Sequence, residues 1–203
     1  MKADWISPAR TALIVIDCQV DFGAPDGEMA RRGADMTAPQ AALVKAASLT
    51  DAARAAGVPV VFVRLVTRGE SKIAHEAKQR RGDDEPELCV EGTRGADFIA
   101  PQPLAGETVV SKTLFSAFAR TGLAEQLQAQ GVDTLVLAGL TTECCIQSSA
   151  WDAFEHDFHV FIAGDACAAY EEALHRHALR ALELSGATVA NSAEFATFWK
   201  KSF

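Results

Sequence analysis

The chain has 203 residues, of which 49% are hydrophobic, and it carries a formal net charge of -8 at pH 7. This length and hydrophobic content suit one domain with a full core, so we expect a single domain over residues 1–203. The acidic balance argues against nucleic acid as the main partner, because binding phosphates requires clustered Lys and Arg.

Apolar runs alternate with segments of helical composition along the chain. The first run, "TALIVID" (11–17), is typical of a buried strand, and the Ala-rich segment 38–56 is typical of a helix. In chain order, further strands are expected at 58–66, 107–112, 134–139, 159–164 and 187–191, and further helices at 121–130, 144–157 and 171–185. Strands this apolar need cover on both faces. The alternation therefore predicts an α/β fold, a Rossmann-like three-layer α/β/α sandwich with a mainly parallel six-stranded sheet.

Segment 67–106 interrupts this alternation, since it is long, polar and rich in Gly, Pro and charged residues. Long irregular segments in compact domains are often lids or binding loops. A plain surface excursion is the alternative.

Three chemically useful side chains follow strands. Asp17 ends the first strand, Lys112 ends the third, and Cys145 comes shortly after the fourth. Ligands bind beyond the carboxyl ends of parallel strands, so these groups are expected to meet there. A nearby cation and a helix N-terminus favour the thiolate form of a cysteine, and the carboxyl group could take and return a proton.

Each of these residues also has an ordinary structural interpretation. Asp17 could cap a turn and Lys112 could lie at the surface. Cys is among the most buried residue types, so Cys145 could be a structural thiol. The residues alone leave these alternatives open.

Three stretches together resemble the isochorismatase-like cysteine hydrolase superfamily: "ALIVIDCQVDF", "SKTLFSAF" and "LVLAGLTTECCIQSSAWDAF". This superfamily includes nicotinamidases, isochorismatases, and amidohydrolases of N-carbamoylsarcosine, ureidoacrylate and biuret. The stretch "VEGTRGADFIAPQPL" (90–104) is similar to a connector of the amidohydrolase branches. The resemblance covers nearly the whole chain and implies one isochorismatase-like hydrolase domain.

The resemblance implies catalytic roles for three residues: Asp17 as the acid–base group, Lys112 as the lysine of the triad, and Cys145 as the nucleophile. Gly139 and Thr142 complete the family pattern of Gly, two residues, Thr, two residues, Cys. Neighbouring residues on a helix point about 100° apart, so only one of two adjacent thiols can face the crevice. The cysteine before the nucleophile is therefore expected to be a passenger.

The resemblance also implies a cis peptide bond between Leu140 and Thr141, and an oxyanion hole formed by the backbone N–H groups of Thr141 and Cys145. Phe22 matches an aromatic residue that binds substrate in relatives. Three further aromatic residues could line the pocket or belong to the core: Phe115, Phe118 and Trp151.

Departures from the family pattern indicate the branch. Nicotinamidases carry a metal-binding Asp-x-His after the second strand, whereas "FVRLVTRGESKIAHEAK" has none and His75 stands alone. We therefore expect no metal and no other cofactor. Isochorismatases commonly have Gly at the nucleophile position, so Cys145 argues against that branch. A vinyl-ether hydrolase using Asp17 as the acid, and an inactive family member, remain the alternatives.

The sequence thus predicts a cysteine hydrolase that cleaves a C–N bond of a small amide, carbamoyl or ureido compound through an acyl-thioenzyme. The first apolar run is short and lacks a cleavage site, and no run has the length of a membrane span, so we expect a cytoplasmic protein that does not bind membranes. Five arginines could bind an acidic substrate group, or be solvent-exposed: Arg64, Arg68, Arg80, Arg81 and Arg94.

The resemblance further implies a homo-oligomer, a dimer or larger. The apolar segment "FATFWKKSF" (195–203) could pack on a neighbouring copy or on its own domain.

Overall fold

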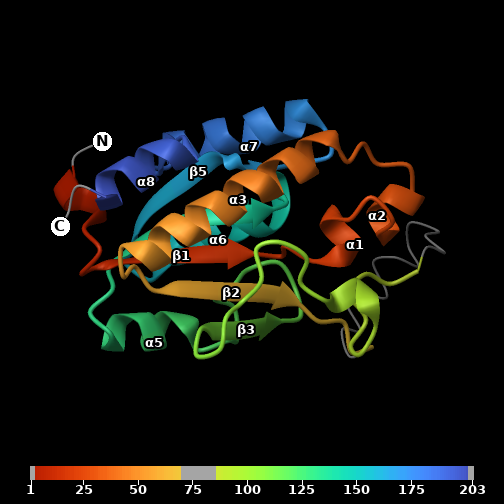
Figure 1. The fold of residues 1–203 in the computed structure, drawn as a ribbon, viewed down its shortest axis with the longest axis horizontal. Helices are drawn as coiled ribbons and strands as arrows, with labels where there is room; N and C mark the ends of the chain where they lie inside the picture. Colours follow the sequence, from red (N-terminus) through yellow and green to blue (C-terminus); the bar gives the residue numbers. More distant parts are fainter. Residues whose placement is uncertain (1–2, 70–85, 201–203) are drawn as a thin grey trace.

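A computed structural model describes residues 3–69 and 86–200 of the chain. Six strands form one sheet in the order β3-β2-β1-β4-β5-β6, and every neighbouring pair is parallel (Figure 1). The strands are β1 (Thr11–Ile16), β2 (Val60–Leu65), β3 (Thr108–Lys112), β4 (Thr134–Leu140), β5 (His159–Ala168) and β6 (Thr188–Ala190). The predicted α/β sandwich with a parallel six-stranded sheet is confirmed.

Helices cover both faces of this sheet (Figure 1). They and the shorter helical turns are η1 (Ala3–Ile6), α1 (Val20–Gly23), α2 (Glu28–Arg31), α3 (Thr37–Ala55), η2 (Arg94–Ala96), α5 (Leu123–Ala129), η3 (Thr142–Ile146), α6 (Gln147–Glu155), α7 (Glu172–Leu184) and α8 (Ser192–Lys200). Within the described ranges, no helix has both the length and the apolar character needed to cross a bilayer.

The alternation of side chains along β1 divides the core into two halves. Leu13 and Val15 belong to the half that contains residues of α3 and α8. Ile14 and Ile16 belong to the half that contains residues of α5, α6 and α7. Because successive strand residues point to opposite faces, a strand this apolar fits only at the centre of a covered sheet.

The long segment 67–106 is described only in part. Residues 70–85 lie outside the described residues, and with them His75, Arg80 and Arg81. The expectation of a lid therefore stays a prediction.

The described part of the C-terminal apolar segment, residues 195–200, packs on its own domain. Phe195 and Trp199 are fully buried beside α3 and β5. The indole Nε1 of Trp199 donates a hydrogen bond to the carbonyl oxygen of Ile6 at 3.1 Å, which joins α8 to η1. The two ends of the described chain therefore lie side by side, at the left of Figure 1.

Gly139 lies where β4 approaches β1, and replacing it with alanine is expected to destabilise the fold. Its φ is +124°, and an added Cβ would lie 1.9 Å from the carbonyl oxygen of Ile16. Both the clash and the unfavourable backbone angle would raise the free energy of the folded state, together by about 3 kcal/mol or more. Urea denaturation measures this loss.

The matched control is Gly131→Ala. Gly131 has a similarly unusual φ of +77°, but an added Cβ there would meet nothing within 4 Å. We expect it to cost about 1 kcal/mol. Equal losses at the two positions would contradict the assignment of a clash at Gly139.

Candidate active site

The three predicted catalytic side chains meet at the carboxyl edge of the sheet, where the arrowheads point in Figure 1. Asp17 directly follows β1, Lys112 is the last residue of β3, and Cys145 lies in η3 just after β4. Lys112 reaches past β2, which lies between β3 and β1. The parallel topology thus joins residues that lie far apart in the sequence.

The Lys112 ammonium contacts both of the other side chains. Its Nζ lies 2.7 Å from Oδ2 of Asp17 and 3.3 Å from Sγ of Cys145. It also donates to the carbonyl oxygen of Leu114 at 2.9 Å. An ammonium has three donors, and these partners account for all of them. Lys112 is only 2% exposed, so the surface role is wrong for it.

The Asp17 carboxyl group is held in a strained and secluded position. The residue is fully buried and has a φ of +52°, an unusual backbone angle for a non-glycine residue. Apart from the ion pair with Lys112, its two oxygens make no well-aligned hydrogen bond with the described part of the chain, although the Cys145 thiol and the Leu65 N–H lie near enough to lower its pKa. The carboxyl group therefore keeps free acceptor capacity for a proton.

The resting site favours a neutral thiol. The hydrogen bond with Cys144, burial and the charge of Asp17 raise the pKa of Cys145, against the lowering effect of Lys112. The expectation that a cation and a helix N-terminus favour the thiolate stays a prediction, since in the resting site the contact with Cys144 and burial oppose the effect of Lys112. Attack then requires a base.

The same surroundings shift the pKa values of Asp17 and Lys112. Burial raises the pKa of Asp17 above its usual value, although Lys112 opposes this effect. Burial would lower the pKa of Lys112, but the charges of Asp17 and Cys145 outweigh burial and raise it. Lys112 thus stays a cation, and Asp17 is a stronger base than an exposed aspartate.

The turn that carries Cys145 is a short π-helix. The backbone N–H of Ile146 donates to the carbonyl oxygen of Thr141, five residues back, at 3.1 Å. Such π-turns occur frequently at functional sites. The peptide bond between Leu140 and Thr141 is cis, at the bond that the resemblance indicates. Among the described residues, the N–H of Thr141 has no backbone acceptor.

Two buried polar residues position the site but were not identified from the sequence. The Gln19 side chain accepts a hydrogen bond from the Leu65 N–H at 2.8 Å, and it donates to carbonyl oxygens of Leu65 and Ala96. It thus fixes the loop after Asp17 to the end of β2. Ser149 donates to the carbonyl oxygen of Cys145 at 2.6 Å and accepts from the N–H of the loop residue Ala117.

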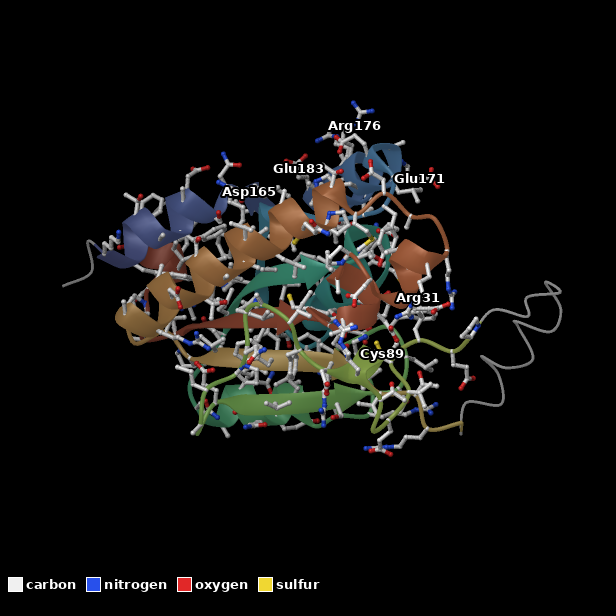
Figure 2. All side chains as sticks on the ribbon, turned by 45° about the vertical axis from the view of Figure 1, so that its right-hand side comes forward. Arg31, Cys89, Asp165, Glu171, Arg176 and Glu183 are labelled. Carbon is white, nitrogen blue, oxygen red and sulfur yellow. The ribbon has the colours of Figure 1, made fainter. Side chains whose placement is uncertain are left out.

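The segment after residue 86 is tied to α1 through Asp21. The Cys89 N–H donates to Oδ2 of Asp21 at 2.7 Å. An added Cβ at Gly95 would lie 2.1 Å from the same oxygen, so only glycine fits there. Figure 2 shows Cys89 at the end of the sheet. This contact brings the connector against the active-site edge.

A further polar contact holds the nucleophile turn from the other side. Thr142 is fully buried, and its Oγ1 lies 2.8 Å from Nδ1 of His175 on α7. Burial lowers the pKa of His175, which favours the neutral ring. This histidine could not be assigned to the site from the sequence. His175 lies on α7, far from Thr142 in the sequence, so no local pattern indicates their contact.

The predicted pocket aromatics differ in their surroundings. Phe22 is half-buried, and its carbonyl oxygen accepts a hydrogen bond from the Tyr170 hydroxyl. Phe115 is 57% exposed and Trp151 is 45% exposed, so the core alternative is wrong for both. Phe118 is a core residue. Substrate binding by Phe22, Phe115 and Trp151 stays a prediction.

The three candidate arginines that lie within the described residues all have protein partners. Arg64 donates to Ser111, Arg68 pairs with Glu91, and Arg94 pairs with Asp26. Within residues 3–69 and 86–200, no cluster of three His, Cys, Asp or Glu side chains could hold a metal ion.

A cavity of about 430 Å³ lies elsewhere, at the ends of β5 and β6, and its lining includes Asp165, His175, Asn191 and Glu194. Both carboxyl oxygens of Asp165 already accept hydrogen bonds from Ser192. This cavity contains no cysteine and none of the three triad residues. In Figure 2 Asp165 lies well away from Cys89. The triad is therefore the better candidate for the reacting site.

Comparisons with known proteins agree on one family. The Isochorismatase domain model matches residues 11–194. The chain is 31% identical to the ureidoacrylate amidohydrolase RutB of Methylobacterium radiotolerans, over 94% of this chain and 80% of that protein. It is 38% identical to a maleamate amidohydrolase of Pseudomonas putida, over 75% of this chain and 70% of that one.

The fold has a close match among solved structures. The crystal structure of a cysteine hydrolase from Pseudomonas syringae pv. phaseolicola superposes with a TM-score of 0.85. It is 24% identical, and the match covers 98% of this chain and 96% of that one. This similarity supports the fold.

Proposed function

The chain belongs to the isochorismatase family of hydrolases, and on that premise we propose that it cleaves the C–N bond of a small amide, carbamoyl or ureido compound. The observation that carries the proposal is the contact of one buried ammonium with both a carboxyl group and a thiol. Lys112 lies 2.7 Å from Asp17 and 3.3 Å from Cys145. The relatives named as amidohydrolases support the same reaction type.

The first half of the proposed reaction forms a thioester. Asp17 takes the proton of the Cys145 thiol as the sulfur attacks the substrate carbonyl carbon. The carbonyl oxygen becomes an oxyanion that accepts hydrogen bonds from the N–H groups of Thr141 and Cys145. The C–N bond then breaks, and Asp17 returns the proton to the leaving nitrogen, which departs as ammonia or an amine.

The second half regenerates the enzyme. Asp17 takes a proton from water, and the resulting hydroxide attacks the thioester carbon. The C–S bond breaks, and the protonated Asp17 gives its proton to the Cys145 sulfur, so both groups return to their starting states. Lys112 keeps its charge throughout, because Asp17 and Cys145 raise its pKa. It therefore stabilises whichever of its two partners carries the negative charge.

Ammonia release from a panel of primary amides, carbamoyl amino acids, biuret and ureido compounds tests the proposal. We expect release from at least one class, at the same rate with and without EDTA, because the proposed steps use only side chains and water. No release from any compound, together with turnover of a vinyl ether such as isochorismate, would contradict the proposal in favour of acid catalysis by Asp17.

Three expectations that accompany this function stay predictions. They are the homo-oligomeric state, the cytoplasmic location and the absence of a cofactor.

A further inference from the structure

One carboxyl oxygen beside the nucleophile has no partner. Glu143 lies in η3, two residues before Cys145. Its Oε1 accepts a hydrogen bond from the hydroxyl of Thr141 at 3.0 Å. Its Oε2 is buried and makes no hydrogen bond within the described part of the chain. Buried polar atoms nearly always have a partner, so this exception, close to a reactive thiol, requires an explanation.

The neighbours of Glu143 place its carboxyl group near the reacting atoms. Thr141, which it binds, supplies one N–H of the proposed oxyanion hole. Burial raises the pKa of Tyr170, and the charges of Glu143 and Cys145 both add to that effect, so both residues lie near the phenol. The Tyr170 hydroxyl already donates to the carbonyl oxygen of Phe22 at 2.9 Å and is therefore committed elsewhere.

No ion pair in the described part of the chain includes this carboxyl group, although Arg32 also lies near Tyr170, where its charge lowers the pKa of the phenol. Glu143 takes part in none of the ion pairs among residues 3–69 and 86–200. The charge of Glu143 acts to raise the pKa of His175, but burial is the larger effect and lowers it. The Nδ1 of that ring is already within hydrogen-bond distance of Thr142. Within the described residues, Oε2 of Glu143 therefore has no hydrogen-bond donor of its own.

We infer that Glu143 determines substrate specificity by accepting a hydrogen bond from an N–H group of the substrate, and that an ammonium group suits it best. The donor would be attached close to the scissile carbonyl carbon, because Glu143 binds the side chain of an oxyanion-hole residue. This inference rests on the proposed function and narrows it: cationic amides are preferred over anionic amides of the same size.

Three amides of matched length test the preference: β-alaninamide, butyramide and succinamate, which end in an ammonium, a methyl group and a carboxylate. For the wild type we expect kcat/KM to be highest for β-alaninamide and lowest for succinamate. Glu143→Gln should lower the ratio of kcat/KM for β-alaninamide to that for butyramide by about 10- to 100-fold. An unchanged ratio, or a wild type that prefers succinamate, would overturn the inference.

A second measurement does not depend on amide hydrolysis. In a Cys144→Ser background, Cys145 is modified with a cationic and with an anionic methanethiosulfonate reagent, and the ratio of the two rates is taken. Glu143→Gln should lower this cation-to-anion ratio by about 5-fold or more, because it removes a nearby negative charge. An unchanged ratio would refute the inference even if the chain hydrolyses amides.

The control is Glu125→Gln, which removes the same charge from an exposed position on α5. It should change neither ratio. Each readout is a ratio within one preparation, so a partial loss of folded protein does not alter it. If no amide is turned over but the rate ratio falls as expected, the proposed function fails while the acceptor role of Glu143 stands.

Discussion

Replacing Cys145 with alanine is expected to lower kcat/KM for amide hydrolysis by about 10⁴-fold or more, since it removes the atom that forms the covalent intermediate. Cys145 is the thiol within reach of the triad ammonium, with Sγ 3.3 Å from Nζ of Lys112. Ammonia release, measured with the best substrate of the panel, checks the loss. Unfolding by urea should show that the variant remains folded, because a small side chain replaces another.

The neighbouring thiol provides the matched control. Cys144→Ser is expected to retain activity within about 10-fold, because Cys144 is half-exposed and packs at the margin of the core. It also shares a hydrogen bond with Cys145, which explains why a modest effect is expected. Loss of activity in Cys144→Ser, with the fold intact and Cys145 present, would contradict the choice of nucleophile.

Replacing Lys112 with methionine is expected to cost about 3–5 kcal/mol of stability and to abolish activity. The substitution leaves the carboxyl group of Asp17 buried without its cation, and breaking a buried ion pair from one side is strongly destabilising. Chemical denaturation measures the stability, and ammonia release measures the activity.

The pH dependence of this variant follows from Asp17. Burial raises the pKa of Asp17 and Lys112 lowers it, so removing Lys112 leaves the raising effect unopposed. An acid whose pKa is raised on folding binds protons more tightly in the folded state. Stability is then greatest at low pH and is lost as the pH rises through the raised pKa. We expect Lys112→Met to be more stable at pH 5 than at pH 8.

A double variant separates charge from packing. Adding Asp17→Asn to Lys112→Met removes the uncompensated charge, so stability should return at pH 8 while activity stays absent. A single variant with wild-type stability at pH 8, or a double variant less stable than the single one, would contradict the assignment of a buried ion pair.

The sheet could be predicted because its strands are long apolar runs bounded by turns. β1 to β4 fall within about two residues of the expected ranges. β5 continues to Ala168, past the expected end at residue 164, because it resumes pairing with β4 after an irregularity, with Gly139 opposite Cys167. No apolar pattern marks such a change in register.

Most of the unpredicted elements are short turns. α1, α2 and η2 have three or four residues each, which is too few for hydrophobic periodicity. α8 did carry a signal. Its start places Asn191 three residues before Glu194, and the Asn191 N–H donates to that carboxyl group at 3.2 Å. A polar capping residue followed three residues later by Glu is typical of a helix N-terminus.

The meeting of Asp17, Lys112 and Cys145 could be predicted because the parallel topology brings the ends of β1, β3 and β4 to one edge, whereas their proposed roles came from the family resemblance. The supporting residues could not be predicted. Gln19, Ser149 and His175 act through contacts with distant segments, such as the link from Gln19 to Leu65 and Ala96. Their partners are set by the packed structure rather than by sequence spacing. A buried polar residue inside a strand-end motif is the signal that would have identified Gln19.

The contact between Trp199 and Ile6 also affects how the protein is made. Ribosomes add about 5–20 residues per second, so the first strand waits about 10–40 s for residue 199 to be synthesised. During this time α3 and β1 lack the aromatic side chains that finally cover them. The nascent chain therefore presents apolar surface to the cell until its translation is almost finished, and chaperones have that interval in which to bind it.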